Sequence, residues 1–294
     1  MFELRQSFLL FITASIWGSA FIAQSLGMDH VSPFTFTFVR TLIGALFLLP
    51  LMPILKALYK NKVKEKSYNK KDLLLGSLCC GLCLITGESF QQFGLLTTDA
   101  GKAGFITSMY IIFVPIVSIF LGKKINRFIW IGVILSAIGL YMLCIKQDLS
   151  IERGDFLIFL CAIAFAIHIL VIDHFVKKVD AVALSCGQFF MASIMGLILL
   201  LIFDRQDLSY DDFIAALPAM AYAGIMSNGI AYTLQIVGQR GLNPTIATLI
   251  MSLESVMAVI FGVIFLQESL MQKEIIGCVL MFSAVIIAQC PFKK

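Results

Sequence analysis

The sequence predicts an all-α integral membrane protein of ten transmembrane helices, arranged as two inverted five-helix repeats around a central cavity. Three observations support this prediction. Hydrophobic residues make up 60% of the 294-residue chain and charged residues only 14%, whereas a soluble domain carries roughly 25% charged residues. The apolar runs are about 18–24 residues long, enough for a helix to cross a hydrocarbon core ~30 Å thick. The second half of the chain also repeats the pattern of the first.

Ten apolar runs follow one another, and most are separated by short connections. They are continuous and do not alternate apolar with polar residues, which argues against a transmembrane β-barrel. Pro33 and Pro244 stand near the starts of two runs, where the missing N–H of proline costs a helix least. The predicted spans are residues 7–26, 33–53, 73–96, 101–122, 127–145, 154–174, 181–203, 212–236, 244–266 and 272–290.

The distribution of lysine and arginine predicts the orientation of the chain in the membrane. With the N-terminus inside, the cytoplasmic segments hold sixteen of the 22 lysines and arginines, and the outer segments hold five. The remaining one, Arg40, lies within a span. Because basic residues accumulate in cytoplasmic loops, we expect a multi-pass protein of the cell (cytoplasmic) membrane with both termini in the cytoplasm. The longest basic loop, residues 56–72, is interpreted as a topology signal.

An internal repeat divides the chain into a first half, residues 1–147, and a second half, residues 148–294. A shift of 148 residues places FITASIWGSAF (11–21) over FLCAIAFAIHI (159–169). Five spans per half is an odd number, so the halves must be inverted in the membrane relative to each other. Inverted repeats are the architecture of many secondary transporters, which bind substrate near the bilayer midplane between the halves.

From the third span onward, a shift of 144 residues aligns the halves better, because the second half has a shorter loop. GKAGFITSMY (101–110) then lies over TIATLIMSLE (245–254), so Tyr110 falls on Glu254. The same shift places Tyr232 at the position of Glu88. Matching polar positions in the two halves are candidates for one shared site.

Glu254, Tyr110 and Trp17 each lie nine or ten residues into a predicted span. At ~1.5 Å per residue this depth is the bilayer midplane. A charged residue there is costly and usually faces a bundle interior or a cavity. We therefore predict that Glu254 faces the space between the halves, where it recognises a substrate amine or carries the coupling proton. The alternative is an acid that only ties helices together.

Other polar groups inside spans complete the candidate site. Arg40 is expected to snorkel or to pair with Glu88 as a structural ion pair, with the binding of an anionic substrate as the alternative. His168 is expected to be a hydrogen-bonded packing residue, with a proton relay as the alternative. A stripe on the eighth span contains Asn228, Tyr232, Gln235 and Gln239. The predicted substrate-binding residues are Trp17, Glu88, Gln91, Tyr110, His168, Tyr232 and Glu254.

Two further features concern the scaffold and its movement. Gly132, Ser136 and Gly139 in the fifth span have the spacing of a close helix contact. We interpret the fifth and tenth spans as scaffold or dimer surfaces, which leaves a homodimer open. Pro115 interrupts the hydrogen bonding of the fourth span and is a candidate bend for gating.

Several segments resemble the drug/metabolite transporter superfamily in its EamA-type branch. They are SIWGSAFIAQ (15–24), FVRTLIGALFLLP (38–50), GKAGFITSMYIIFVPIVSIFLGKKI (101–125) and SLESVMAVIFGVIFLQESL (252–270). The resemblance covers the whole chain as two EamA-like units and implies a ten-helix transporter with a central cavity, usually exporting small metabolites. Where the family usually has proline after the ninth-span glutamate, this chain has Ser255.

The predicted function is a secondary transporter that exports small metabolites, such as amino acids or drug-like amphipathic compounds, by alternating access. It is driven by a proton gradient or runs as a facilitator. No Gly-rich phosphate loop is present, so the chain has no ATP-driven engine of that kind. We expect no metal, cofactor or nucleic acid, and name the small-molecule substrate and the lipid bilayer as partners. The alternative is an intramembrane enzyme acting on a lipid or isoprenoid, which needs clustered His, Asp or Cys near one membrane face.

Overall fold

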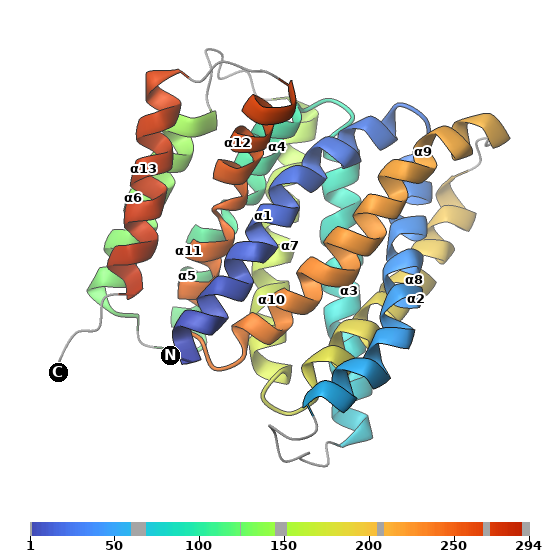
Figure 1. Ribbon diagram of the computed structural model, residues 1–294, viewed down its shortest axis with the longest axis horizontal. Helices are drawn as coiled ribbons and strands as arrows, with labels where there is room; N and C mark the ends of the chain where they lie inside the picture. The colour runs from blue at the N-terminus through green and yellow to red at the C-terminus, as the bar shows by residue number, and fades with distance from the viewer. Residues whose placement is uncertain are drawn as a thin grey trace.

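A computed structural model shows how the chain folds (Figure 1). The described parts form a bundle of helices that run side by side and are joined by short connections. Within these parts, nine helical segments are long and apolar enough to cross a membrane, and a tenth apolar helix is shorter. The predicted all-α membrane fold is therefore confirmed. The structure describes residues 2–59, 69–123, 125–144, 152–204, 209–266 and 271–289.

The helices of the first half agree with the predicted spans, with one interruption in the fourth. Pro33 begins the second helix, as predicted. The helices are α1 (Phe2–Met28), α2 (Pro33–Tyr59), α3 (Lys70–Gly94), α4 (Ala100–Thr107), α5 (Tyr110–Phe120) and α6 (Arg127–Cys144).

The helices of the second half follow the same order, and two of its spans are divided. Asn243 caps the helix that begins at Pro244, since its side chain accepts a hydrogen bond from the Thr245 amide. The helices are α7 (Arg153–Phe175), α8 (Ala181–Phe203), α9 (Tyr210–Tyr222), the π-helix η1 (Ala223–Ala231), α10 (Tyr232–Gln239), α11 (Pro244–Met251), α12 (Glu254–Leu266) and α13 (Gln272–Gln289).

The fourth and ninth spans are both interrupted, at positions that the internal repeat makes equivalent. α4 and α5 are separated at residues 108–109, and α11 and α12 at residues 252–253. Bonds between residues three apart tighten both turns: the Ile111 amide donates to the Ser108 carbonyl and the Ser255 amide to the Ser252 carbonyl. The interruption lies upstream of Pro115, which sits inside α5. A proline bend is therefore not the cause, because the second break forms without one.

The eighth span contains the π-helix η1, and this changes which of its residues share a face. A π-helix closes its hydrogen bonds five residues apart, so its turns are wider than those of an α-helix. The four residues of the predicted stripe are all buried but do not share one environment. Tyr232 and Gln235 reach the central cavity, whereas Asn228 packs against α2, and Gln239 is not among the cavity-lining residues.

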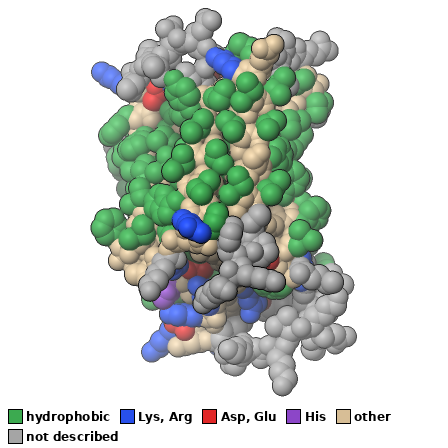
Figure 2. All heavy atoms as spheres, turned by 90° about the vertical axis from the view of Figure 1, so that its left-hand side faces the viewer, with side chains coloured by type: hydrophobic (Ala, Val, Ile, Leu, Met, Phe, Trp, Pro, Cys, Tyr) green, Lys and Arg blue, Asp and Glu red, His purple; other side chains and the backbone are tan. Residues whose placement is uncertain are grey.

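α6 and α13 pack along each other at one side of the molecule (Figure 1). A Cβ built at Gly139 would lie 2.7 Å from the Gly277 carbonyl oxygen, so glycine allows these two backbones to approach closely. Figure 2 shows that this side of the molecule carries a broad hydrophobic band with lysine and arginine side chains toward its ends. Ile134 and Val279 are among its exposed apolar residues. An apolar surface of this kind fits both predicted roles of these two helices, a scaffold or a dimer surface.

Candidate functional site

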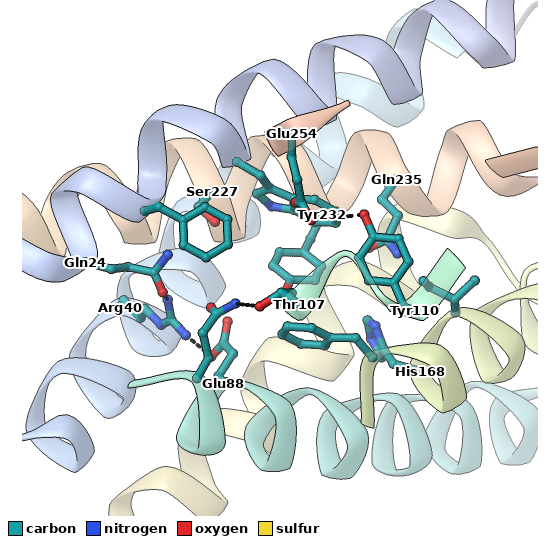
Figure 3. Close-up of a pocket in the computed structure, with 15 residues that line it drawn as sticks. Gln24, Arg40, Glu88, Thr107, Tyr110, His168, Ser227, Tyr232, Gln235 and Glu254 are labelled. Carbon is teal, nitrogen blue, oxygen red and sulfur yellow. Dashed lines mark hydrogen bonds and ion pairs between the residues drawn. The ribbon is translucent and has the colours of Figure 1, made fainter. Parts of the chain in front are cut away.

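A cavity lies between the two halves of the chain, and both halves supply its walls (Figure 3). The first half contributes side chains from α1 to α5, and the second half from α7, η1, α10 and α12. All seven residues predicted to bind substrate line this one cavity. Its lining residues are Trp17, Phe21, Gln24, Arg40, Glu88, Gln91, Thr107, Tyr110, Phe165, His168, Ile169, Ser227, Tyr232, Gln235 and Glu254.

Glu254 is the first residue of α12 and is only 3% exposed. Its Oε1 accepts a hydrogen bond from the Tyr110 hydroxyl at 3.0 Å and another from the Ser108 hydroxyl at 3.1 Å. Tyr110 is the first residue of α5, so the two residues that the repeat aligns meet directly after the two helix breaks. The start of a helix also favours a negative charge, since its free amides carry partial positive charge.

Arg40 and Glu88 form a buried ion pair in the same cavity, as predicted. Nη2 of Arg40 lies 3.3 Å from Oε2 of Glu88, and the two side chains are 2% and 1% exposed. Arg40 Nη1 also donates to Gln24 Oε1 at 2.6 Å. Among the described residues, neither Glu88 oxygen has a hydrogen bond of regular geometry, although Arg40 and the Asn228 amide both interact with this carboxylate.

Another part of the cavity wall is aromatic. The rings of Trp17 and Tyr232 meet edge to face with centroids 4.8 Å apart, and His168 and Tyr232 with centroids 5.9 Å apart. His168 Nε2 is hydrogen bonded to Gln188 Oε1 at 3.0 Å, which is the packing arrangement expected for it. Phe165 takes the position that the repeat assigns opposite Trp17, and both rings line the cavity.

Sequence reasoning missed Ser108, Thr107 and Ser227. Thr107 and Ser108 lie three and two residues before Tyr110, and Thr107 Oγ1 accepts a hydrogen bond from Gln91 Nε2 at 3.2 Å. Two adjacent hydroxyls within an apolar run were a usable signal for Ser108 and Thr107. Ser227 reaches the cavity from the π-helix, and no periodicity of an α-helix would have indicated it.

In the described part of the chain, no group of three or more His, Cys, Asp or Glu is placed to hold a metal ion. The alternative of an intramembrane enzyme called for clustered His, Asp or Cys near one membrane face. The titratable groups of the cavity are the Arg40–Glu88 pair, the Tyr110–Glu254 pair, His168 and Tyr232, each from a different helix.

Comparison with known proteins places the chain in a family. Residues 5–145 and again residues 152–289 match the EamA-like transporter family. An uncharacterized transporter of Archaeoglobus fulgidus is 30% identical over 279 residues, which cover 95% of this chain and 83% of the relative. The uncharacterized transporter YoaV of Bacillus subtilis is 23% identical, with 95% and 94% covered.

One solved structure, titled "Crystal structure of protein", shares the fold. Its TM-score is 0.75 at 14% sequence identity, and the match covers 97% of this chain and 96% of that chain. The two family matches each span five of the predicted membrane segments, in agreement with the internal repeat. The protein is a multi-pass membrane transporter with two copies of one five-helix unit, and it belongs to the EamA-like transporter family.

Proposed function

We propose that this transporter is a secondary carrier that exports small amphipathic metabolites, such as amino acids or drug-like compounds, by alternating access. The supporting observation is the cavity whose walls come from both halves. A solute bound there touches both repeats at once, so movement of one half against the other changes the side from which the solute is reached.

The cavity wall has a polar part and an aromatic part, and this combination favours an amphipathic substrate. Arg40, Glu88 and Gln24 offer donors and acceptors for a polar head, and Figure 3 shows Arg40 and Gln24 together on one side of the cavity. Trp17 and Tyr232 offer ring surface for an apolar body. Binding sites for small molecules commonly combine an apolar lining with a few fixed polar groups that determine orientation.

We further propose that Glu254 carries the coupling proton. No cationic side chain pairs with this carboxylate among the described residues: the hydrogen bonds to it come from two hydroxyls. It therefore has no fixed counter-charge, and a proton or a substrate amine is the natural partner for it. Glu254 lies directly after the break at residues 252–253 and contacts Tyr110, which lies directly after the break at residues 108–109. Binding of a proton or an amine to Glu254 is therefore linked to both halves.

The proposed direction of transport is outward across the cell membrane, and the proposed orientation of the chain has both termini in the cytoplasm. Only the orientation of the chain rests on the excess of lysine and arginine in the segments that would face the cytoplasm. Lys123, Lys177 and Lys178 are three of them, and the first two pair with Asp173 near the end of α7. Labelling of single cysteines introduced into the loops of intact cells would test the orientation directly.

The experiment is transport by purified protein in proteoliposomes, with a panel of amino acids and cationic drugs, with and without a pH gradient. We expect uptake by the wild type to follow the gradient, and the Glu254→Gln variant to lose that dependence while still exchanging substrate. Glu274→Gln is the matched control, because Glu274 is a buried carboxylate that caps the start of α13 outside the cavity. Equal, gradient-independent transport by wild type and Glu254→Gln would show a facilitator in which Glu254 only ties helices.

A further inference from the structure

The two helix breaks meet in space and are joined by side-chain hydroxyls. Ser108 lies in the break of the fourth span, and its Oγ donates to Glu254 Oε1 at 3.1 Å. The same Oγ lies 3.0 Å from Ser255 Oγ, and Ser255 Oγ is 3.4 Å from the Gly104 carbonyl oxygen. Ser108, Ser255 and Glu254 are all at most 3% exposed. The contact therefore joins residues of the two repeats in a site closed to bulk water.

We propose that Ser108 is a positioning residue, which holds the Glu254 carboxylate across the joint of the two repeats and sets the pH range of transport. The inference rests on the proposed role of Glu254 as proton carrier. Ser108 has one hydroxyl proton, and the bond to Glu254 uses it. Ser255 then donates to Ser108 or to the Gly104 carbonyl, and in the first case the two hydroxyls form a directed chain that ends on the carboxylate.

Donation by two hydroxyls to one carboxylate oxygen stabilises its charged form relative to its protonated form. Tyr110 supplies one of these bonds and Ser108 the other, and both bonds end on Oε1. Together they hold this oxygen between the two helix breaks. Removal of the Ser108 hydroxyl leaves a single donor, so Glu254 would keep its proton to higher pH and would no longer be held in one orientation.

The second repeat shows that this arrangement is specific to Ser108. Its counterpart by the 144-residue shift is Ser252, in the other helix break, which is equally buried. Ser252 Oγ donates to the Leu249 carbonyl at 2.9 Å and lies 3.4 Å from Ser136 Oγ. It makes no bond to an acid in the described structure. A hydroxyl in a helix break is therefore not sufficient, and Ser252 is a matched control.

Other titratable groups lie around the same cavity, and their effects on the pH profile must be distinguished from the effect of Glu254. They come from α2, α3, α5, α7 and α10, which form the cavity together with α12. His168 is the one among them whose ordinary titration falls near neutral pH, so a His168→Gln background removes its contribution. These groups are Arg40, Glu88, Tyr110, Cys161, His168 and Tyr232.

The test is the pH profile of substrate exchange in proteoliposomes for the wild type and for Ser108→Ala, Ser108→Thr and Ser252→Ala, each also in the His168→Gln background. We expect the midpoint of the profile to rise by about one pH unit in Ser108→Ala, the size of one hydrogen bond to a charged group. Threonine keeps the hydroxyl, so Ser108→Thr should restore the wild-type midpoint. Ser252→Ala should leave it unchanged.

A midpoint in Ser108→Ala equal to that of the wild type, while Glu254→Gln abolishes the profile, overturns the inference and leaves the proposed function standing. An unchanged profile in Glu254→Gln overturns both. A midpoint shift in the Ser252→Ala control would also overturn the inference, since it would show a general effect of helix breaks. If Ser108→Ala does not fold, Ser108→Cys replaces it, since a thiol is a weaker donor and should produce a smaller shift in the same direction.

Discussion

Replacement of Arg40 by glutamine is expected to destabilise the folded protein by about 3–5 kcal/mol, the cost of leaving one partner of a buried ion pair without the other. Arg40 and Glu88 are 2% and 1% exposed, so water cannot take over the lost interaction. Gln24 would lose the hydrogen bond at 2.6 Å from Arg40 Nη1 as well. Thermal unfolding of the purified protein in detergent measures the effect.

The double variant Arg40→Gln/Glu88→Gln tests whether the unpaired charge of Glu88 causes the loss of stability in Arg40→Gln. Because both charges are then absent, we expect the double variant to be more stable than Arg40→Gln alone, with a coupling between the two sites well above ~0.5 kcal/mol. Lys102→Gln is the control, since its ion pair with Asp155 includes a lysine that is 32% exposed and should contribute at most about 1 kcal/mol. Independent, additive losses for Arg40→Gln and Glu88→Gln would contradict a structural ion pair and favour a role in substrate binding alone.

Replacement of Gly18 by alanine is expected to reduce both stability and transport. A Cβ built at Gly18 would lie 2.6 Å from the Glu254 carbonyl oxygen and 2.7 Å from the Ala258 amide nitrogen. These are backbone atoms of α12, so the helices must move apart, at a cost of about 1–3 kcal/mol for overpacking. Gly18 follows Trp17 in the chain and packs against Glu254, so the separation displaces two walls of the cavity.

The measurement is the unfolding temperature together with the rate of substrate exchange. Gly101→Ala is the matched control, because a Cβ built at Gly101 meets nothing within 4 Å. We expect Gly101→Ala to unfold at the wild-type temperature or slightly above it, since alanine favours a helix over glycine. A Gly18→Ala protein with the transport rate and unfolding temperature of the wild type would show that α1 and α12 do not need this close contact.

The sequence alone determined the spans, the repeat and most of the cavity. In the membrane, a backbone must satisfy its own hydrogen bonds, so each apolar run long enough to cross becomes a helix. A polar side chain inside such a run is costly unless it faces protein or water. For this reason Glu254, Tyr110, Glu88 and Tyr232 could be assigned to one cavity from their depth and from the repeat alone, and the structure places them there.

The tertiary structure alone decided how those residues contact each other. The breaks at residues 108–109 and 252–253 contain no proline or glycine that would announce them, and they lie where one repeat packs on the other. The π-helix that carries Ser227 and Asn228 likewise has no marker in the spacing of its residues. Ser108 reaches Glu254 across 146 positions of the chain. Periodicity indicates which face of a segment lies against lipid and which against protein. A contact such as Ser108–Glu254 depends on where two distant segments cross, and no local sequence pattern encodes the place of that crossing.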